Sequence, residues 1–183
     1  MRALGANLGL AAVVGWVGFA LAGLVLGPTG ASVLGCLIGV VCVTALRATL
    51  PVRALMALLA PFGVVLPALA LRHAAVGIGL PIPGLSSLEL AVFLVAYVAF
   101  LAAAFGLFST DIYRFGYSPT PVVCMVLGVC AYSLVTGNWF LAGIAVAGQL
   151  AWAMKWGSSN WFDHVLHVVL VPVVALSLLA RMF

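Results

Sequence analysis

Charged residues are what this sequence has least of. They make up 5% of its 183 residues, and only three of them are acidic. A soluble domain carries about a quarter of its residues as charged ones, so this chain could not cover a water-facing surface. The seven basic residues are scattered singly between apolar segments. That pattern excludes a clustered phosphate-binding patch, and we expect no nucleic acid partner.

Paired cysteine motifs are also missing. The four cysteines, Cys36, Cys42, Cys124 and Cys130, lie inside apolar segments, and no C-x-x-C occurs. Disulfide, redox and zinc-finger chemistry therefore have little support in the sequence. We interpret these thiols as packing residues, since a free cysteine behaves as a small hydrophobe.

Hydrophobic residues are abundant instead: they make up 67% of the chain, and its mean hydropathy is +1.37. The apolar runs reach the roughly 20 residues that a helix needs to cross a bilayer. The sequence therefore predicts an all-α integral membrane protein, a single polytopic transmembrane domain over residues 1–183 in the inner (cytoplasmic) membrane. The first apolar run is longer than a signal-peptide core, so we interpret it as a retained first span.

Breaks at prolines, glycines and polar clusters divide the chain into about seven predicted transmembrane helices. These cover residues 5–27, 31–46, 54–71, 88–108, 121–136, 139–154 and 161–179. The fifth and sixth are short for a full crossing. Six spans plus a re-entrant hairpin formed by that pair is therefore the alternative.

Basic residues between the spans predict the orientation. With seven spans, one side of the membrane holds Arg2, Arg47, Arg53, Arg114 and Lys155, and the other holds Arg72 and Arg181. Cytoplasmic loops carry the excess of lysine and arginine. We therefore expect a cytoplasmic N-terminus and a C-terminus on the opposite side.

Small residues recur at a spacing of four, as in Gly5/Gly9, Gly23/Gly27, Gly35/Gly39 and Gly143/Ala147. This spacing lets helix backbones approach closely in lipid, so it predicts helix packing. The same Gly-rich helices offer a surface for a homo-oligomer or for a membrane-protein partner.

Proline-bearing helices end two similar triplets of spans. Pro61 and Pro67 lie in the third predicted span and Pro172 in the seventh, where each removes a helical hydrogen bond and predicts a kink. In both triplets a short outer hairpin and a basic inner loop precede that helix, and span four links the triplets. Parallel repeats of this kind occur in small transporters.

The segment NWFDHVLHVV, residues 160–169, concentrates one acid and two histidines in a chain that has three of each. On a continuous helix, Asp163 and His167 are one turn apart, and His164 falls within the same arc of about 100°. The spacing therefore predicts one polar face near the start of the last span.

Three interpretations of that face stay open. Asp163 can simply cap a helix at the membrane surface. Alternatively, Asp163 and His167 form an inner site for an ion or small solute, supported by His164 and by the loop residues Asp111 and Arg114. The third interpretation is a metal site with Asp163 and His167 as zinc ligands; apart from zinc, no cofactor is predicted. We expect His167 to matter more than His164 because it lies deeper.

Two short resemblances accompany this segment. DHVLHVVL resembles the last-helix segment of the progestin/adiponectin-receptor and alkaline-ceramidase superfamily, which implies a seven-span, zinc-dependent amide hydrolase. Asp163 stands where that family has the first histidine of a His-x-x-x-His motif. The aromatic-Asp-x-x-Leu-His pattern that begins at Phe162 is similar to that of VanZ-type membrane proteins, which implies nothing about chemistry.

The sequence thus predicts a small membrane translocator, a transporter or channel, for an ion or small solute. Its inner polar vestibule contains the scarce ionisable side chains. One alternative is an intramembrane metal-dependent hydrolase of a lipid-like amide or ester. The other is a non-catalytic subunit of a larger membrane complex, which the shortness of the polar loops favours.

Overall fold

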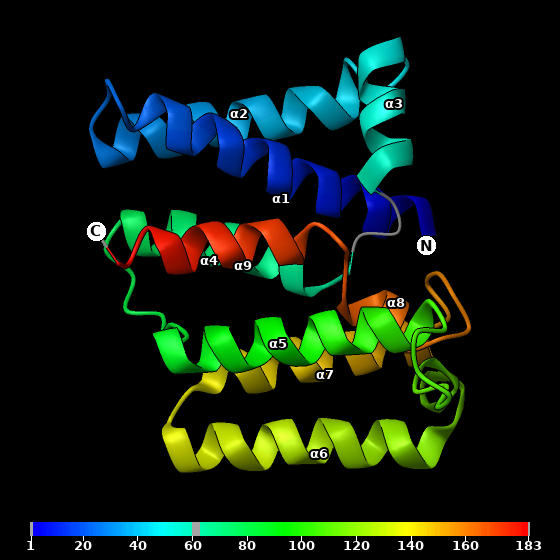
Figure 1. Ribbon diagram of the computed structural model, residues 1–183. Helices are drawn as coiled ribbons and strands as arrows, with labels where there is room; N and C mark the ends of the chain where they lie inside the picture. Colours follow the sequence, from blue (N-terminus) through cyan, green and yellow to red (C-terminus); the bar gives the residue numbers. More distant parts are fainter. Residues whose placement is uncertain (1, 60–62, 183) are drawn as a thin grey trace. The chain divides into compact units, whose positions relative to one another are not determined.

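The computed structural model describes residues 2–59 and 63–182, and helix accounts for 73% of the chain. No residue in those two ranges lies in a strand, so the prediction of an all-helical protein is confirmed. The chain divides into two compact units, Met1–Ile82 and Pro83–Phe183, called unit 1 and unit 2 below. Figure 1 shows the helices of both units, coloured along the chain.

Unit 1 begins with a hairpin of two helices, α1 (Arg2–Ala22) and α2 (Pro28–Thr44), which lie side by side in Figure 1. Pro28 opens α2, where its fixed φ suits a helix start and its missing N–H costs nothing. The two helices of the hairpin contact each other through their backbones. A Cβ on Gly39 would lie 2.5 Å from the carbonyl oxygen of Ala11, and a Cβ on Gly35 would lie 2.6 Å from the carbonyl oxygen of Gly15. The predicted packing role of Gly35/Gly39 is confirmed.

The third predicted span is not one helix. The chain forms α3 (Leu50–Leu59), which turns steeply away from α1 and α2 in Figure 1, and then α4 (Val65–Gly77). Pro67 is the third residue of α4, where no intrahelical donor is needed, so it starts a helix instead of kinking one. The predicted kink at Pro61 lies outside the described residues. The end predicted at residues 72–73 was wrong, because α4 continues to Gly77.

The aromatic side chains of α1 hold α4 in place. The centre of the His73 ring lies 5.8 Å from the centre of the Trp16 ring and 6.3 Å from the centre of the Phe19 ring. Gly77 leaves room for the Phe19 ring, since a Cβ there would lie 2.5 Å from its tip. His73 is thus a packing residue of unit 1.

Unit 2 contains three well-defined helices whose ends follow from local sequence. Ser86 and Glu89 form a capping box at the start of α5 (Ser87–Ala104). A proline opens α6 (Pro119–Thr136), and Gly137 ends it with a left-handed φ of 69°, which glycine adopts without strain. The helix α7 (Trp139–Ala153) packs back against α6.

The seventh predicted span is also interrupted. A single turn, α8 (Phe162–Val165), is followed by extended backbone at Leu166, with φ −101° and ψ 151°, and then by α9 (Leu170–Leu179). Pro172 is again the third residue of the new helix, and the N–H of Val171 donates to the carbonyl of Val168 that the proline cannot reach (3.1 Å). The prediction of a continuous helix over 161–179 was wrong.

Within the described residues, three helices are long and apolar enough to cross a membrane, at Leu4–Ala22, Ser87–Ala104 and Pro119–Thr136. Shorter apolar helices cover Pro28–Thr44, Val65–Gly77, Trp139–Ala153 and Leu170–Leu179. Large apolar side chains stand exposed on them, with Val135 at 88% and Leu134 at 84%. Soluble monomers rarely expose broad apolar surface. These features indicate an integral membrane protein.

Candidate functional site

The side chains of Asp163 and Tyr113 meet across 50 residues of sequence. Asp163 comes from α8 and is half-buried, and Tyr113 begins the 3₁₀ helix η1 (Tyr113–Tyr117) in the loop between α5 and α6. The Tyr113 hydroxyl donates between the two carboxylate oxygens, each 2.8 Å away. Burial and then this carboxylate raise the pKa of the Tyr113 hydroxyl above its ordinary value. The Asp163 carboxylate therefore has one fixed hydrogen-bond donor, the Tyr113 hydroxyl.

Asn160 holds this pair together. It is completely buried, and its amide group donates to the Tyr113 carbonyl (2.8 Å) while its side-chain oxygen accepts from the N–H of Phe162 (2.9 Å). The second bond satisfies one of the orphan amides at the start of α8. One side chain thus fixes both the start of α8 and the backbone that carries the Tyr113 hydroxyl.

Gly116 allows η1 and α8 to approach so closely. Its carbonyl accepts from the N–H of Trp161 (2.9 Å), and a Cβ at this position would collide with the side chain of Asn160 and lie 2.7 Å from the ring of Phe162. The contact therefore depends on a glycine for space, and not for an unusual φ.

Aromatic rings form the wall beside the carboxylate. The Phe162 ring lies 4.6 Å from that of Phe100 on α5 and 6.3 Å from that of Tyr113. The Tyr97 ring continues the row at 6.1 Å from Phe100. An apolar wall on one side strengthens electrostatic interactions of the carboxylate by excluding water.

The two histidines near Asp163 have separate partners. Nε2 of the buried His164 lies 2.8 Å from the Ser158 carbonyl, so this nitrogen must carry a proton, because a carbonyl only accepts. Nδ1 of His167 accepts from the N–H of Val169 (3.2 Å), just before α9 begins. The extended backbone at Leu166 separates His167 from Asp163, so the predicted one-turn spacing on a single helical face does not hold.

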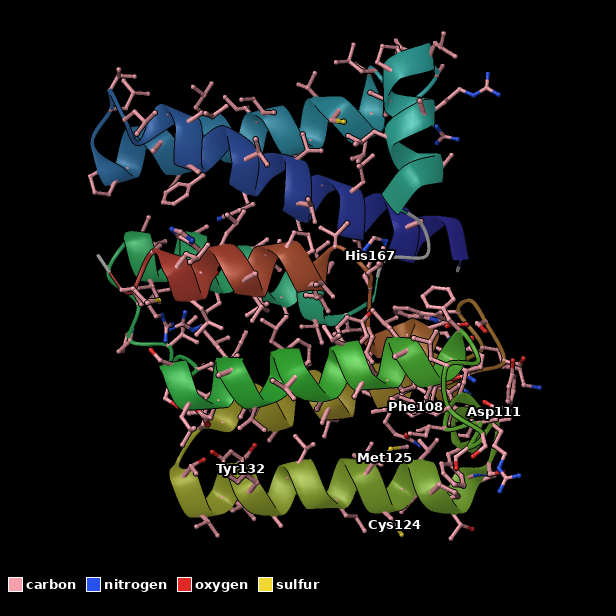
Figure 2. All side chains as sticks on the ribbon, in the orientation of Figure 1. Phe108, Asp111, Cys124, Met125, Tyr132 and His167 are labelled. Carbon is pink, nitrogen blue, oxygen red and sulfur yellow. The ribbon has the colours of Figure 1, made fainter. Side chains whose placement is uncertain are left out.

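The loop residues Asp111 and Arg114 are exposed and make local contacts. A carboxylate oxygen of Asp111 accepts from the N–H of Arg114 (3.3 Å), and the Arg114 guanidinium lies over the ring of Phe115, 5.4 Å from its centre. The loop does contact the last apolar segment, but through Tyr113. The support of the site by Asp111 and Arg114 stays a prediction. Figure 2 shows Asp111 in this loop.

Metal ligation by Asp163 and His167 stays a prediction. Within residues 2–59 and 63–182, no group of three His, Cys, Asp or Glu side chains is placed to hold an ion. Comparison of the chain with protein-family models, curated proteins and solved structures finds no match.

Sequence reasoning missed Asn160 and Gly116 as the residues that build this site. The side chain of Asn160 accepts from the N–H two residues on, as asparagines do in Asx-turns, and this local signal could have been noticed. The requirement for glycine at position 116 leaves no local signal, because it arises from a side chain far along the chain.

Proposed function

We propose that this chain is a small multi-pass membrane protein that moves an ion or a small solute across the membrane. The paired Asp163 and Tyr113 form the inner end of its path. The observation that carries the proposal is the contact between a scarce carboxylate and the hydroxyl of a half-buried tyrosine, beside an interrupted helix.

The energetic argument starts from the cost of charge. A carboxylate in the hydrocarbon layer costs about 2.5–3.5 kcal/mol at mid-membrane on the translocon scale, and less near the interface. Such groups therefore face a bundle interior or a water-filled cavity. Asp163 has that character, since a hydroxyl and a row of aromatic rings surround it on the protein side.

The interrupted helices support the same function. Backbone without helical hydrogen bonds is tolerated at membrane depth only where protein covers it or where it lines a water-filled cavity. Small transporters place their sites at such discontinuous helices. Here α4 and α9 both restart just before a proline, and at about 1.5 Å per residue neither reaches the roughly 30 Å of the hydrocarbon core. Under this proposal, residues 54–77 and 161–179 cross as interrupted spans.

The proposed topology has seven spans, with the N-terminus in the cytoplasm and the C-terminus on the far side. Ser86 lies just before α5, whereas Ser158 lies in the segment between α7 and α8, beyond the far end of α7. Single cysteines at these two positions, in a chain whose four native cysteines are replaced by alanine, should react with impermeant reagents from opposite faces of the membrane. Labelling from the same face would remove the seven-span topology.

Transport itself is tested in proteoliposomes. Trapped pyranine reports proton entry, and light scattering after an osmotic step reports entry of potassium chloride or glycerol. We expect Asp163→Asn to lower the flux of the transported species about tenfold or more. Tyr113→Phe should lower it less, because the carboxylate keeps its charge and loses only one donor.

The matched control is Ser177→Ala, which deletes a hydroxyl that bonds only within α9, to the Val173 carbonyl (2.8 Å). It should leave the flux unchanged. If Asp163→Asn elutes as folded protein and retains the flux of the wild type, Asp163 is only a cap at the membrane surface. A stoichiometric zinc ion in the purified protein would favour the hydrolase alternative, and stoichiometric isolation within a larger complex would favour the subunit.

A further inference from the structure

A second polar site lies at the other end of unit 2. A pocket of about 490 Å³ is lined by the start of α5, by the end of α6 and by the turn between α6 and α7. Its polar lining residues are Ser86, Glu89, Tyr132, Thr136 and Asn138. Figure 2 shows Tyr132 on α6 far from Asp111, so this pocket and the Asp163 site occupy different ends of the unit.

Glu89, the single glutamate of the chain, supplies the charge of the pocket. One of its carboxylate oxygens accepts from the N–H of Ser86 (2.6 Å), and the other accepts from the hydroxyl of Tyr132 (2.8 Å). Each carboxylate oxygen has a second acceptor site that these bonds leave unused. The bonds hold the carboxylate in a fixed position while keeping its capacity to accept from a ligand.

The neighbouring hydroxyls also act as acceptors. The Tyr132 hydroxyl donates its hydrogen bond to Glu89, and the Thr136 hydroxyl donates to the Tyr132 carbonyl (2.9 Å). The oxygen of each therefore has only lone pairs to offer an incoming group.

Asn138 is a buried polar residue in the turn between α6 and α7. It is 5% exposed, and its amide group donates to the Gly84 carbonyl (3.0 Å). Its side-chain oxygen has no hydrogen-bond partner among the described residues. That oxygen is enclosed by protein atoms, so Asn138 shapes the wall of the pocket and offers no acceptor to a ligand.

A basic side chain, that of Arg181, lies at the same end of unit 2 and already donates hydrogen bonds. The Arg181 guanidinium donates to the Leu85 carbonyl (2.9 Å) and lies 3.4 Å from the Ser87 hydroxyl. It is therefore directed to the first residues of α5, next to the pocket wall. Among the polar groups that line the pocket itself, the charged one is the carboxylate of Glu89.

We propose that this pocket binds the primary ammonium group of a small organic solute. An ammonium group combines a positive charge with three N–H donors, which match the acceptors of Glu89, Tyr132 and Thr136. The volume selects an organic ligand over a bare ion, because ligand pockets measure roughly 300–1,000 Å³ whereas one water needs on the order of 30 Å³. Binding here does not require that the chain transport anything.

The test is calorimetric titration of the full chain with ethylammonium chloride, in nanodiscs of phosphatidylcholine. We expect saturable binding by the wild type. Tetramethylammonium, which has the same charge and no N–H donor, should bind about tenfold more weakly or worse. Glu89→Gln should also weaken ethylammonium binding about tenfold or more, while a glutamine keeps the capping box of α5.

Two threonines give a matched control. Thr136 and Thr44 each end a helix and each donate to the carbonyl four residues earlier, at 2.9 Å and 2.7 Å, but only Thr136 lines the pocket. Thr136→Val should weaken binding several-fold, and Thr44→Val should leave it unchanged. The absence of saturable binding by the wild type overturns the proposal, as does equal binding of both cations or a folded Glu89→Gln variant that binds like the wild type.

The lipid composition of the nanodisc distinguishes two possible sources of the ammonium group. A free solute and the ethanolamine headgroup of a phospholipid share this chemistry. If phosphatidylethanolamine in the nanodisc lowers the apparent affinity for ethylammonium, the pocket takes the headgroup. If the affinity stays the same, the ligand is a free amine.

Discussion

The two units of this chain use different contacts between their helices. In unit 1, α1 and α2 meet at backbone, with Gly15, Gly35 and Gly39 at the contact, and the side chains there supply mainly apolar bulk. In unit 2, side chains from distant segments reach one another, as Tyr113 reaches Asp163 and Tyr132 reaches Glu89. All three carboxylates of the chain also lie in unit 2. Unit 1 therefore has the features of a scaffold, and unit 2 carries the groups that can interact with a polar ligand.

The units are nevertheless similar where each ends. Val65-Leu66-Pro67 begins α4 and Leu170-Val171-Pro172 begins α9, so a proline is the third residue of both helices. A short helix comes before each, α3 in unit 1 and α8 in unit 2. The two prolines lie at corresponding positions of the two predicted triplets, and the repeat itself stays a prediction. The units differ in their polar residues, since all three acidic side chains lie in unit 2.

In this comparison of the two units, the largest loss of stability is expected from Asn160→Ala in unit 2. The change leaves the Phe162 N–H and the Tyr113 carbonyl without their partner, and each such buried group costs about 1–3 kcal/mol. Chemical unfolding of the purified protein in detergent should show that loss. Asn160→Asp keeps the acceptor but buries a carboxylate against the Tyr113 carbonyl oxygen, so its loss should be at least as large. An Asn160→Ala variant within about 0.5 kcal/mol of the wild type, the range of surface changes, would show that the contact is dispensable.

A somewhat smaller effect is expected from Gly39→Ala in unit 1. The new methyl group meets the Ala11 carbonyl and the Cα of Gly15, which cannot move without separating α1 from α2. Overpacking of this kind costs about 1–3 kcal/mol. Gly143→Ala is the matched control, because nothing lies within 4 Å of that position in α7. It should leave stability equal or raise it by up to about 1 kcal/mol. Equal losses from both variants would mean that glycine packing does not distinguish the units.

The sequence predicts the regular part of this fold well. The ends of α6 and α7 fall within two residues of their predicted positions, since Pro119 and Gly137 act locally and leave a visible signal. The interrupted spans were missed for a different reason. Pro67 and Pro172 each remove one hydrogen bond, and local sequence does not show whether that kinks a helix or marks the start of a new one.

The site was harder to predict than the helices. Asp163 was identified because an acid is conspicuous in an apolar segment, but its partner was not, since Tyr113 approaches it only after two helices have folded back. Glu89 was overlooked because an acid near a helix start looks like an ordinary cap. Its hydrogen bond from Tyr132 was not visible in the sequence, because Tyr132 is 43 residues away and approaches Glu89 only in the folded unit.

The contact between Tyr113 and Asp163 also has a consequence for the order of assembly. The hairpin of α6 and α7 lies entirely between these two residues, so it must fold back before they can meet. Closing a preformed hairpin costs less entropy than closing a flexible loop of the same length. During synthesis, Asp163 leaves the ribosome after η1 and both hairpin helices, because a chain is made from its N-terminus. The unpaired carboxylate therefore arrives at a membrane in which its tyrosine partner is already present. Completion of unit 2 is thus a late event in biogenesis, and it takes place at a contact that neither half of the unit can form alone.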